Sequence, residues 1–181
     1  MYFSQVFSLL QDYGKPFQCP VERLGLDENF MDISNLIEVR KKSETSLISQ
    51  VSGNVYGQDL NGGCHCQHDC RSNLILGSIV ANEIRKIIFQ TIGLTTSCGI
   101  SCNKLLAKLA GAVHKPNQQT TLFPWSGREF VTSLTNARVI PGIGSSTFKI
   151  LESKGLSSVR DIQDSSMDFL SSFLGSSCSF S

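Results

Sequence analysis

The sequence lacks any apolar run of about 18 residues, so it offers no segment that could cross a membrane as a helix. Its first residues, MYFSQVFSLL, are apolar but lack the basic residues and the cleavage site of a signal peptide, and we expect an amphipathic helix there. Excess charge is also scarce, because 16 basic and 15 acidic residues give a formal net charge of +1. Any surface that binds a polyanion must therefore depend on local clusters of lysine.

Cysteine, by contrast, occurs seven times, which is typical of reduced thiols in an intracellular compartment. Cysteines and histidines cluster at residues 63–70 (GCHCQHDC), which suggests a zinc site. The candidate ligands alternate or are adjacent, however, and no distant CxxC pair completes a tetrahedron. We therefore favour a surface loop at Cys64–Cys70, with metal binding as the alternative. We expect Cys98 and Cys102 to act as small apolar fillers.

The most informative segment is residues 98–120 (CGISCNKLLAKLAGAVHKPNQQT), which predicts a strand followed by a helix over Asn103–His114. One side of this helix is a basic face with a glycine, formed by Lys104, Lys108 and Gly111. The side predicted to be buried consists of Leu105, Leu109 and Val113. Pro116 disfavours helical backbone at Lys115, so that lysine is expected to project from an extended segment. The pattern suits a polyanion, and an amphipathic surface helix with solvated lysines fits the same residues.

A second segment, VERLGLDENFMDISNLIEVR, predicts two short strands, Val21–Gly25 and Phe30–Ile33, joined by a tight connection that holds Asp27 and Glu28. Two adjacent carboxylates at the tip of a hairpin can reach one point in space, and carboxylate oxygens are ligands that Mg²⁺ prefers. A solvated loop is the alternative for the same residues. Asp32 is expected to have a structural role, bonding backbone at the end of its strand.

A third segment, VIPGIGSSTFKILESKGLSSVRDI, predicts two helices joined by a Pro-Gly-Ile-Gly hairpin. Gly155 is expected to end the second helix as its C′ residue. Ser145 or Ser146 would lie at the start of that helix, where several backbone N–H groups point outward and can bind a phosphate. An ordinary helix–helix turn is the alternative.

The rest of the chain predicts strands mixed with helices, followed by an all-helical end. A strong amphipathic helix is expected at Leu74–Ile92, with Gly93 just past its end. The other predicted elements are helices at Met1–Asp12, Leu36–Lys42, Gly127–Leu134, Ser145–Ser153 and Ser157–Asp161, and strands at Ile48–Tyr56, Thr96–Ile100 and Thr120–Phe123. This order predicts the α+β fold class.

The signature G-[IV]-[SA]-x-N-K-x-L-A-K, followed by K-P-N, is matched in register at Gly99–Lys108 and at Lys115–Asn117. It resembles the palm signature of the Y-family, or translesion, DNA polymerases. The VERLGLDENF and PGIG segments resemble the second carboxylate motif and the thumb helix-hairpin-helix of that family. The resemblance implies a partial polymerase palm followed by a small helical thumb. It also implies a DNA-directed DNA polymerase that joins a dNTP to a primer 3′-OH with two Mg²⁺ (or Mn²⁺) ions, in DNA damage bypass and repair.

The same resemblance implies roles for individual residues. Asp27 would be a catalytic metal ligand, and Glu28 would support the metal site or handle the proton of the primer hydroxyl. Lys115 would neutralise the incoming triphosphate, while Asn103 and Lys104 would hold the palm near the nucleotide or the template. The DNA-binding residues of the thumb would be Gly142, Gly144, Ser145 and Lys149.

The match also has departures. No D-x-D-x-F strand precedes Asp27, and neither the fingers nor the C-terminal little-finger domain has a counterpart, so we interpret the chain as a truncated polymerase. Its expected domains are a partial palm at residues 1–125, a thumb at 126–170 and a disordered tail at 171–181. A non-catalytic DNA-binding or interaction module derived from such a polymerase is the alternative. The implied partners are primer-template DNA, dNTP and replication or repair proteins, without a membrane, and the implied location is the nucleus.

Overall fold

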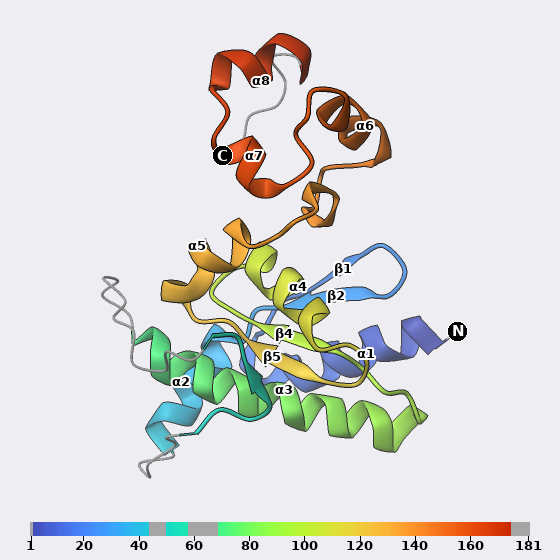
Figure 1. Cartoon of the computed structure of the whole chain (residues 1–181). Coiled ribbons are helices and arrows are strands. Elements are labelled where there is room, and N and C mark those ends of the chain that lie inside the picture. Colours follow the sequence, from blue (N-terminus) through green and yellow to red (C-terminus); the bar gives the residue numbers. More distant parts are fainter. Residues whose placement is uncertain (1, 44–49, 58–68, 175–181) are drawn as a thin grey trace. The chain divides into compact units, whose positions relative to one another are not determined.

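The structure is a computed structural model that describes residues 2–43, 50–57 and 69–174. It divides into two compact units, Met1–Trp125 and Ser126–Ser181, which are described separately. Figure 1 shows a small parallel sheet flanked by helices in the first unit, and the described part of the second unit consists of helices and turns.

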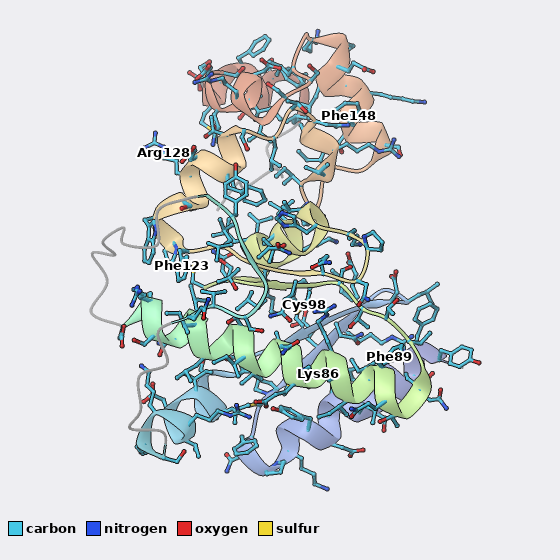
Figure 2. The ribbon with its side chains drawn as sticks, turned by 60° about the horizontal axis from the view of Figure 1, so that its bottom comes forward. Lys86, Phe89, Cys98, Phe123, Arg128 and Phe148 are labelled. Carbon is cyan, nitrogen blue, oxygen red and sulfur yellow. The ribbon has the colours of Figure 1, made fainter. Side chains whose placement is uncertain are left out.

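The centre of the first unit is a parallel sheet with the strand order β3 (Asn54–Val55), β5 (Gln119–Thr121) and β4 (Cys98–Ile100). Parallel neighbours need a long crossover, which helix α4 (Lys104–Val113) supplies between β4 and β5. Helix α3 (Cys70–Ile92) lies on the other face of the sheet (Figures 1 and 2). Because helices cover both faces, every residue of the middle strand β5 is buried.

The predicted strands near residues 96–100 and 120–123 are confirmed as β4 and β5. The predicted strand Ile48–Tyr56 is wrong in its length, since within its described part only β3 is a strand. Residues 48–49 lie outside the described residues.

Helix α3 contributes residues to two hydrophobic cores. Its N-terminus is capped by Asp69, whose carboxylate accepts the backbone N–H of Ser72 at 3.2 Å, and its C-terminus ends at Gly93 with φ 72°. The core beside the sheet contains Leu74, Ile75, Ala81, Ile100 and Phe123. The second core contains Cys19, Leu36, Ile37, Leu76 and Val80. The prediction of an amphipathic helix that stops before Gly93 is confirmed.

Strands β1 (Val21–Leu24) and β2 (Glu28–Met31) form an antiparallel hairpin in which Leu24 pairs with Glu28. Gly25, with φ 72°, supplies the left-handed backbone that closes the turn. The hairpin follows helix α1 (Tyr2–Gly14) and the short 3₁₀ helix η1 (Lys15–Phe17), and it leads into helix α2 (Ser34–Ser43).

A polar cluster of Tyr13, Arg40 and Glu83 ties α1, α2 and α3 together. The Arg40 guanidinium donates to both carboxylate oxygens of Glu83, at 2.8 and 2.5 Å, and the Tyr13 hydroxyl donates to Glu83 Oε2 at 2.9 Å. The hydrogen bond from Arg40 is the main cause that lowers the pKa of Glu83. Burial, together with the bond to Glu83, raises the pKa of Tyr13 to about 12.

Helix α4 is rotated relative to the prediction. Its buried residues are Leu106, Leu109 and Ala110. Leu105 and Val113, predicted to be buried, are each 40% exposed. A Cβ on Gly99 would lie 1.9 Å from the carbonyl oxygen of Ala107 and 2.4 Å from the nitrogen of Gly111, so the backbones of β4 and α4 are in direct contact. The glycine of the predicted basic face, Gly111, therefore allows the backbone of β4 to approach α4 closely.

The described part of the second unit, up to residue 174, contains five short helical elements. They are α5 (Pro124–Thr132, which begins in the first unit), η2 (Ala137–Val139), α6 (Ser145–Ser153), α7 (Val159–Gln163) and α8 (Met167–Leu174). Their core contains Leu151, Leu156 and Leu170.

Helix α6 has the predicted bounds and ends in the predicted way. Gly155 has φ 76°, its N–H donates to Glu152 at 2.9 Å, and the N–H of Leu156 donates to Leu151 at 3.0 Å. This pair of bonds is a Schellman motif, and the contact between the two leucines completes it.

The end of the second unit differs from the prediction of disorder from residue 171. Helix α8 continues to Leu174, because the buried Leu170 anchors it and Phe173 packs against the same core. Residues 175–181 lie outside the described residues.

Candidate nucleotide and metal site

The carboxylates of the β1–β2 hairpin face the lysines of α4. Lys108 Nζ lies 2.8 Å from Glu28 Oε2, with the two side chains 29% and 43% exposed. One turn earlier, Lys104 forms an ion pair with Glu22 on β1, and its Nζ lies 6.0 Å from the centre of the Phe30 ring. Both lysines of the predicted basic face are thus already paired with the chain's own carboxylates.

The two predicted metal ligands occupy different kinds of backbone. Asp27 is the last residue of the turn and is exposed, whereas Glu28 is the first residue of β2. The prediction that both lie in the connection is therefore wrong for Glu28, because Gly25 closes the turn earlier than expected and frees Glu28 to pair with Leu24. The consequence is that cross-strand pairing fixes the backbone of Glu28.

Asp32, expected to be structural, is confirmed in that role. Its Oδ1 accepts the backbone N–H of Ser34 at 2.9 Å and the Ser34 hydroxyl at 2.6 Å, at the start of α2. These bonds, the hydroxyl bond first, lower the pKa of Asp32.

Asn103 holds the start of α4. Its Oδ1 accepts the backbone N–H of Leu106 at 2.8 Å, which is the bond of an N-cap residue. Ser101 donates to the carbonyl of Leu122 at 2.8 Å, so the signature between β4 and α4 is fixed at both ends. Both contacts are structural, and they orient the helix that carries Lys108.

Lys115 lies in the connection between α4 and β5. His114 is the C-cap of α4, and its Nδ1 lies 2.9 Å from the Thr120 hydroxyl. Lys115 itself is exposed and outside any helix, as predicted. Asn117 has φ 51°, which is left-handed backbone at a residue other than glycine.

Arg85 on α3 holds this connection, a contact that the sequence does not predict. Its Nη2 donates to the carbonyl and to Oδ1 of Asn117, at 2.8 Å each. A lone arginine in an amphipathic helix carries no sequence signal for such a contact, because Asn117 lies 32 residues further along the chain.

The candidate DNA-binding residues belong to the second unit. Gly142 has φ 97° in the turn, Gly144 is the N-cap of α6, and Lys149 is exposed on that helix. The Ser145 hydroxyl accepts a hydrogen bond from Arg138 at 2.9 Å. A turn with a left-handed glycine followed by helix α6 is present where the sequence predicts it.

The predicted cysteine and histidine cluster lies almost wholly outside the described residues. Its last two members are described: Asp69 caps α3 and Cys70 begins that helix. Cys98 fits the predicted role of an apolar filler, since it packs against the core beside α3 (Figure 2), and burial raises its pKa to about 11. Cys102 is exposed, so the same prediction is wrong for it.

The hairpin carboxylates are suitable donors for Mg²⁺. Within residues 2–43, 50–57 and 69–174, no group of three or more His, Cys, Asp or Glu side chains could hold a metal ion by itself. In sites that transfer phosphoryl groups, however, Mg²⁺ is bound by one or two carboxylates together with substrate phosphates. The exposed Asp27 and the half-buried Glu28 carry oxygen donors of the type that such sites use.

Comparison with known proteins gives matches along most of the chain. Residues 2–112 match the impB/mucB/samB family. DNA polymerase iota of Homo sapiens is 42% identical over 175 residues, which cover 94% of this chain and 23% of that protein. DNA polymerase iota of Drosophila melanogaster is 38% identical over 167 residues, covering 92% of this chain and 22% of that protein. The chain thus spans under a quarter of the length of these relatives.

Two solved structures share the fold. The crystal structure of DinB from Sulfolobus solfataricus has a TM-score of 0.67 at 22% identity, covering 97% of this chain and 41% of that one. The insertion ternary complex of Dbh DNA polymerase has a TM-score of 0.67 at 22% identity, covering 96% and 40%. The mixed α/β arrangement of helices and small sheets is therefore similar to the fold of these two structures. None of the described helices is long and apolar enough to cross a membrane.

Proposed function

We propose that this chain takes part in DNA-directed DNA synthesis, because it belongs to the impB/mucB/samB family, the Y-family of translesion DNA polymerases. The reaction is nucleotidyl transfer from a dNTP to the 3′-OH of a primer during damage bypass and repair. The observation that carries the proposal is the 42% identity with DNA polymerase iota of Homo sapiens, which extends over 94% of this chain.

In this proposal the first unit is the palm. Asp27 and Glu28 would hold Mg²⁺ or Mn²⁺, which would supply Lewis-acid stabilisation of the charge on the phosphate. Lys115, exposed at the end of α4, places its ammonium against the triphosphate. Asn103, as the cap of α4, and Lys104, through its ion pair with Glu22, hold the helix in place and do not take part in chemistry.

The second unit is proposed to be the thumb, which holds duplex DNA through a helix-hairpin-helix. Gly142 and Gly144 leave the backbone accessible at the turn, and the first N–H groups of α6, from Ser145 on, have no partner within the helix. Such groups bind a phosphate without reading a base, and Lys149 adds a positive charge on the same helix. The proposed partners are primer-template DNA, dNTP and replication or repair proteins, in the nucleus.

One observation favours a second candidate, a DNA-binding or interaction module without catalysis. The Glu28 carboxylate is paired with Lys108, so its charge is already compensated. A palm used only as a scaffold would keep this ion pair permanently, and only the second unit would contact DNA.

The test is Mg²⁺-dependent primer extension by this chain, with duplex binding measured in parallel at several salt concentrations. Under the first proposal, Asp27→Ala abolishes extension and leaves duplex binding nearly unchanged, because the carboxylate contacts the metal and not the duplex. If the unaltered chain binds duplex in a salt-sensitive way but extends no primer, the second candidate holds. Equal loss of extension and duplex binding in Asp27→Ala would contradict the assigned role of Asp27.

A further inference from the structure

Lys115 differs from the other two lysines of the signature segment. Lys104 and Lys108 are paired with carboxylates of the hairpin, whereas Lys115 is exposed and forms no ion pair with the described residues. A flexible lysine loses considerable side-chain and loop entropy when it binds a ligand. Its value to a site therefore depends on how firmly its backbone is held.

The backbone beside Lys115 is held by Arg85. In addition to its two bonds with Asn117, the guanidinium donates from Nη1 to Gln119 Oε1 at 3.2 Å and from Nε to the carbonyl of Thr96 at 2.9 Å. The Arg85 side chain thus binds the segment before β4, at Thr96, and the segment after Lys115, at Asn117 and Gln119.

Gln119, one of the residues that Arg85 binds, is itself buried in the core. Gln119 is 2% exposed, and its side-chain nitrogen donates to the carbonyls of Ser52 and Ser78 at 2.7 Å each. Because Arg85 bonds a buried and fully bound glutamine, it has a fixed position from which to hold Asn117. Asn117 has left-handed backbone, which most residues avoid, and the hydrogen bonds from Arg85 stabilise it in that conformation.

The charge of Arg85 is also left available. Each of its four bonds goes to an amide or carbonyl oxygen, and no carboxylate among the described residues pairs with it. A guanidinium bonded only to neutral oxygens has no anion beside it to compensate its charge. That charge lies beside the segment that carries Lys115, so both cations favour an anion there.

We propose that Arg85 is a positioning residue that fixes the segment Lys115–Gln119, so that Lys115 meets the polyphosphate of a bound nucleotide. The inference rests on the proposed function, in which Lys115 binds the triphosphate. Arg85 acts through Asn117 and Gln119, and it reduces the ordering that binding would otherwise require.

The test measures binding of dTTP with Mg²⁺ by calorimetry and hydrogen exchange of the amides at residues 117–119, on the whole chain. Arg85→Lys keeps the charge but loses the planar fork, so it should weaken dTTP binding about tenfold and speed up local exchange. In a Lys115→Ala background, Arg85→Lys should have less than about a twofold further effect, because both changes disable one interaction.

A matched control separates positioning from general stability. Arg40→Lys also replaces an arginine that holds another helix through several bonds, and it should lower the melting temperature while leaving dTTP affinity within about twofold. A second variant, Asn117→Gly, keeps the left-handed backbone and the carbonyl but removes Oδ1. It should weaken dTTP binding about threefold without disturbing the core.

The outcomes are distinct. If the unaltered chain binds no dTTP, the proposed role of Lys115 fails and the inference fails with it. If the chain binds dTTP but Arg85→Lys weakens binding no more than Arg40→Lys does, the inference alone is overturned. Additive effects of Arg85→Lys and Lys115→Ala, or an unchanged affinity in Asn117→Gly, overturn it as well.

Discussion

The ammonium of Lys108 on α4 lies 2.8 Å from a carboxylate oxygen of Glu28 on β2, and this ion pair joins the helix of the Gly99–Lys108 signature to the β1–β2 hairpin. Such a partly exposed pair contributes only about 0–1 kcal/mol to stability. Its larger effect is on charge, because a cation at this distance competes with any metal ion that approaches Glu28.

We therefore expect Lys108→Gln to tighten binding of Mn²⁺ to the chain about three- to tenfold, since the removed charge lies 2.8 Å from an oxygen of the proposed ligand Glu28. Titration of free Mn²⁺ by electron paramagnetic resonance measures this without any catalytic step. Lys86→Gln, which removes the same charge from an exposed position on α3 (Figure 2), is the matched control and should leave Mn²⁺ affinity unchanged. Unchanged or weaker Mn²⁺ binding in Lys108→Gln would show that Lys108 does not compete with the metal ion for Glu28.

The contact between Gly99 and Gly111 makes a second prediction. Gly99→Ala should destabilise the first unit by about 3 kcal/mol or more, because its Cβ would overlap backbone atoms that cannot move independently. Gly111→Ala, whose Cβ would lie 3.0 Å from the nitrogen of Gly99, should cost less. Thermal unfolding followed by circular dichroism ranks the variants. Gly93→Ala is the control, with open space around it and only a positive φ to accommodate; if Gly99→Ala cost no more than this control, the close approach would be refuted.

The family and several local elements could be predicted from the sequence, and the family prediction is confirmed by the match over residues 2–112. Helix α3 and the end of α6 were predictable because their signals are local: an apolar period, and a glycine at the C′ position. The side of α4 that is buried could not be predicted. Periodicity gives the width of an apolar face, whereas the contact of Gly99 with Gly111 determines which side of the helix faces the sheet.

The site was less predictable than the fold, since its contacts join distant segments. Nothing in the sequence shows that Lys104 and Lys108 pair with Glu22 and Glu28, some eighty residues away (|i−j| 82 and 80). The position of Glu28 within β2 depends on the backbone of Gly25, which a pattern of turn-forming residues did not resolve. The metal and nucleotide roles of Asp27, Glu28 and Lys115 stay predictions.

The cluster of Tyr13, Arg40 and Glu83 predicts how stability depends on acid. Arg40 lowers the pKa of Glu83, so the unfolded chain binds the proton more readily than the folded one. The stabilisation is complete above the ordinary value of 4.5 and is lost as the pH falls through the lowered pKa. Because Glu83 is 38% exposed, we expect only about 1 kcal/mol. Urea unfolding at a series of pH values should show a weaker acid dependence in Glu83→Gln, and an unchanged acid limb would contradict the assignment.

The same cluster predicts the opposite dependence in alkali. The pKa of Tyr13 is raised from 10.0 to about 12, so the folded chain holds the phenol proton more tightly and stability falls as the pH rises between these values. Tyr13→Phe should remove this loss while keeping the ring packed. Tyr2→Phe makes the same change at a residue that is 60% exposed and should leave the alkaline limb as it is. Equal alkaline limbs in Tyr13→Phe and the unaltered chain would place the titration elsewhere.

The C-terminus of α6 allows a test confined to the second unit. Gly155 has φ 76° with no atom within 4 Å of an added Cβ, so Gly155→Ala tests backbone conformation alone and should cost about 1 kcal/mol. Gly144→Ala is the matched control, because its φ of −77° suits any residue and its surroundings are equally open. Hydrogen exchange of the amides around Leu151 and Leu156 should accelerate in Gly155→Ala and stay unchanged in Gly144→Ala. Equal exchange in the two variants would mean that the two Schellman hydrogen bonds do not limit the opening of this unit.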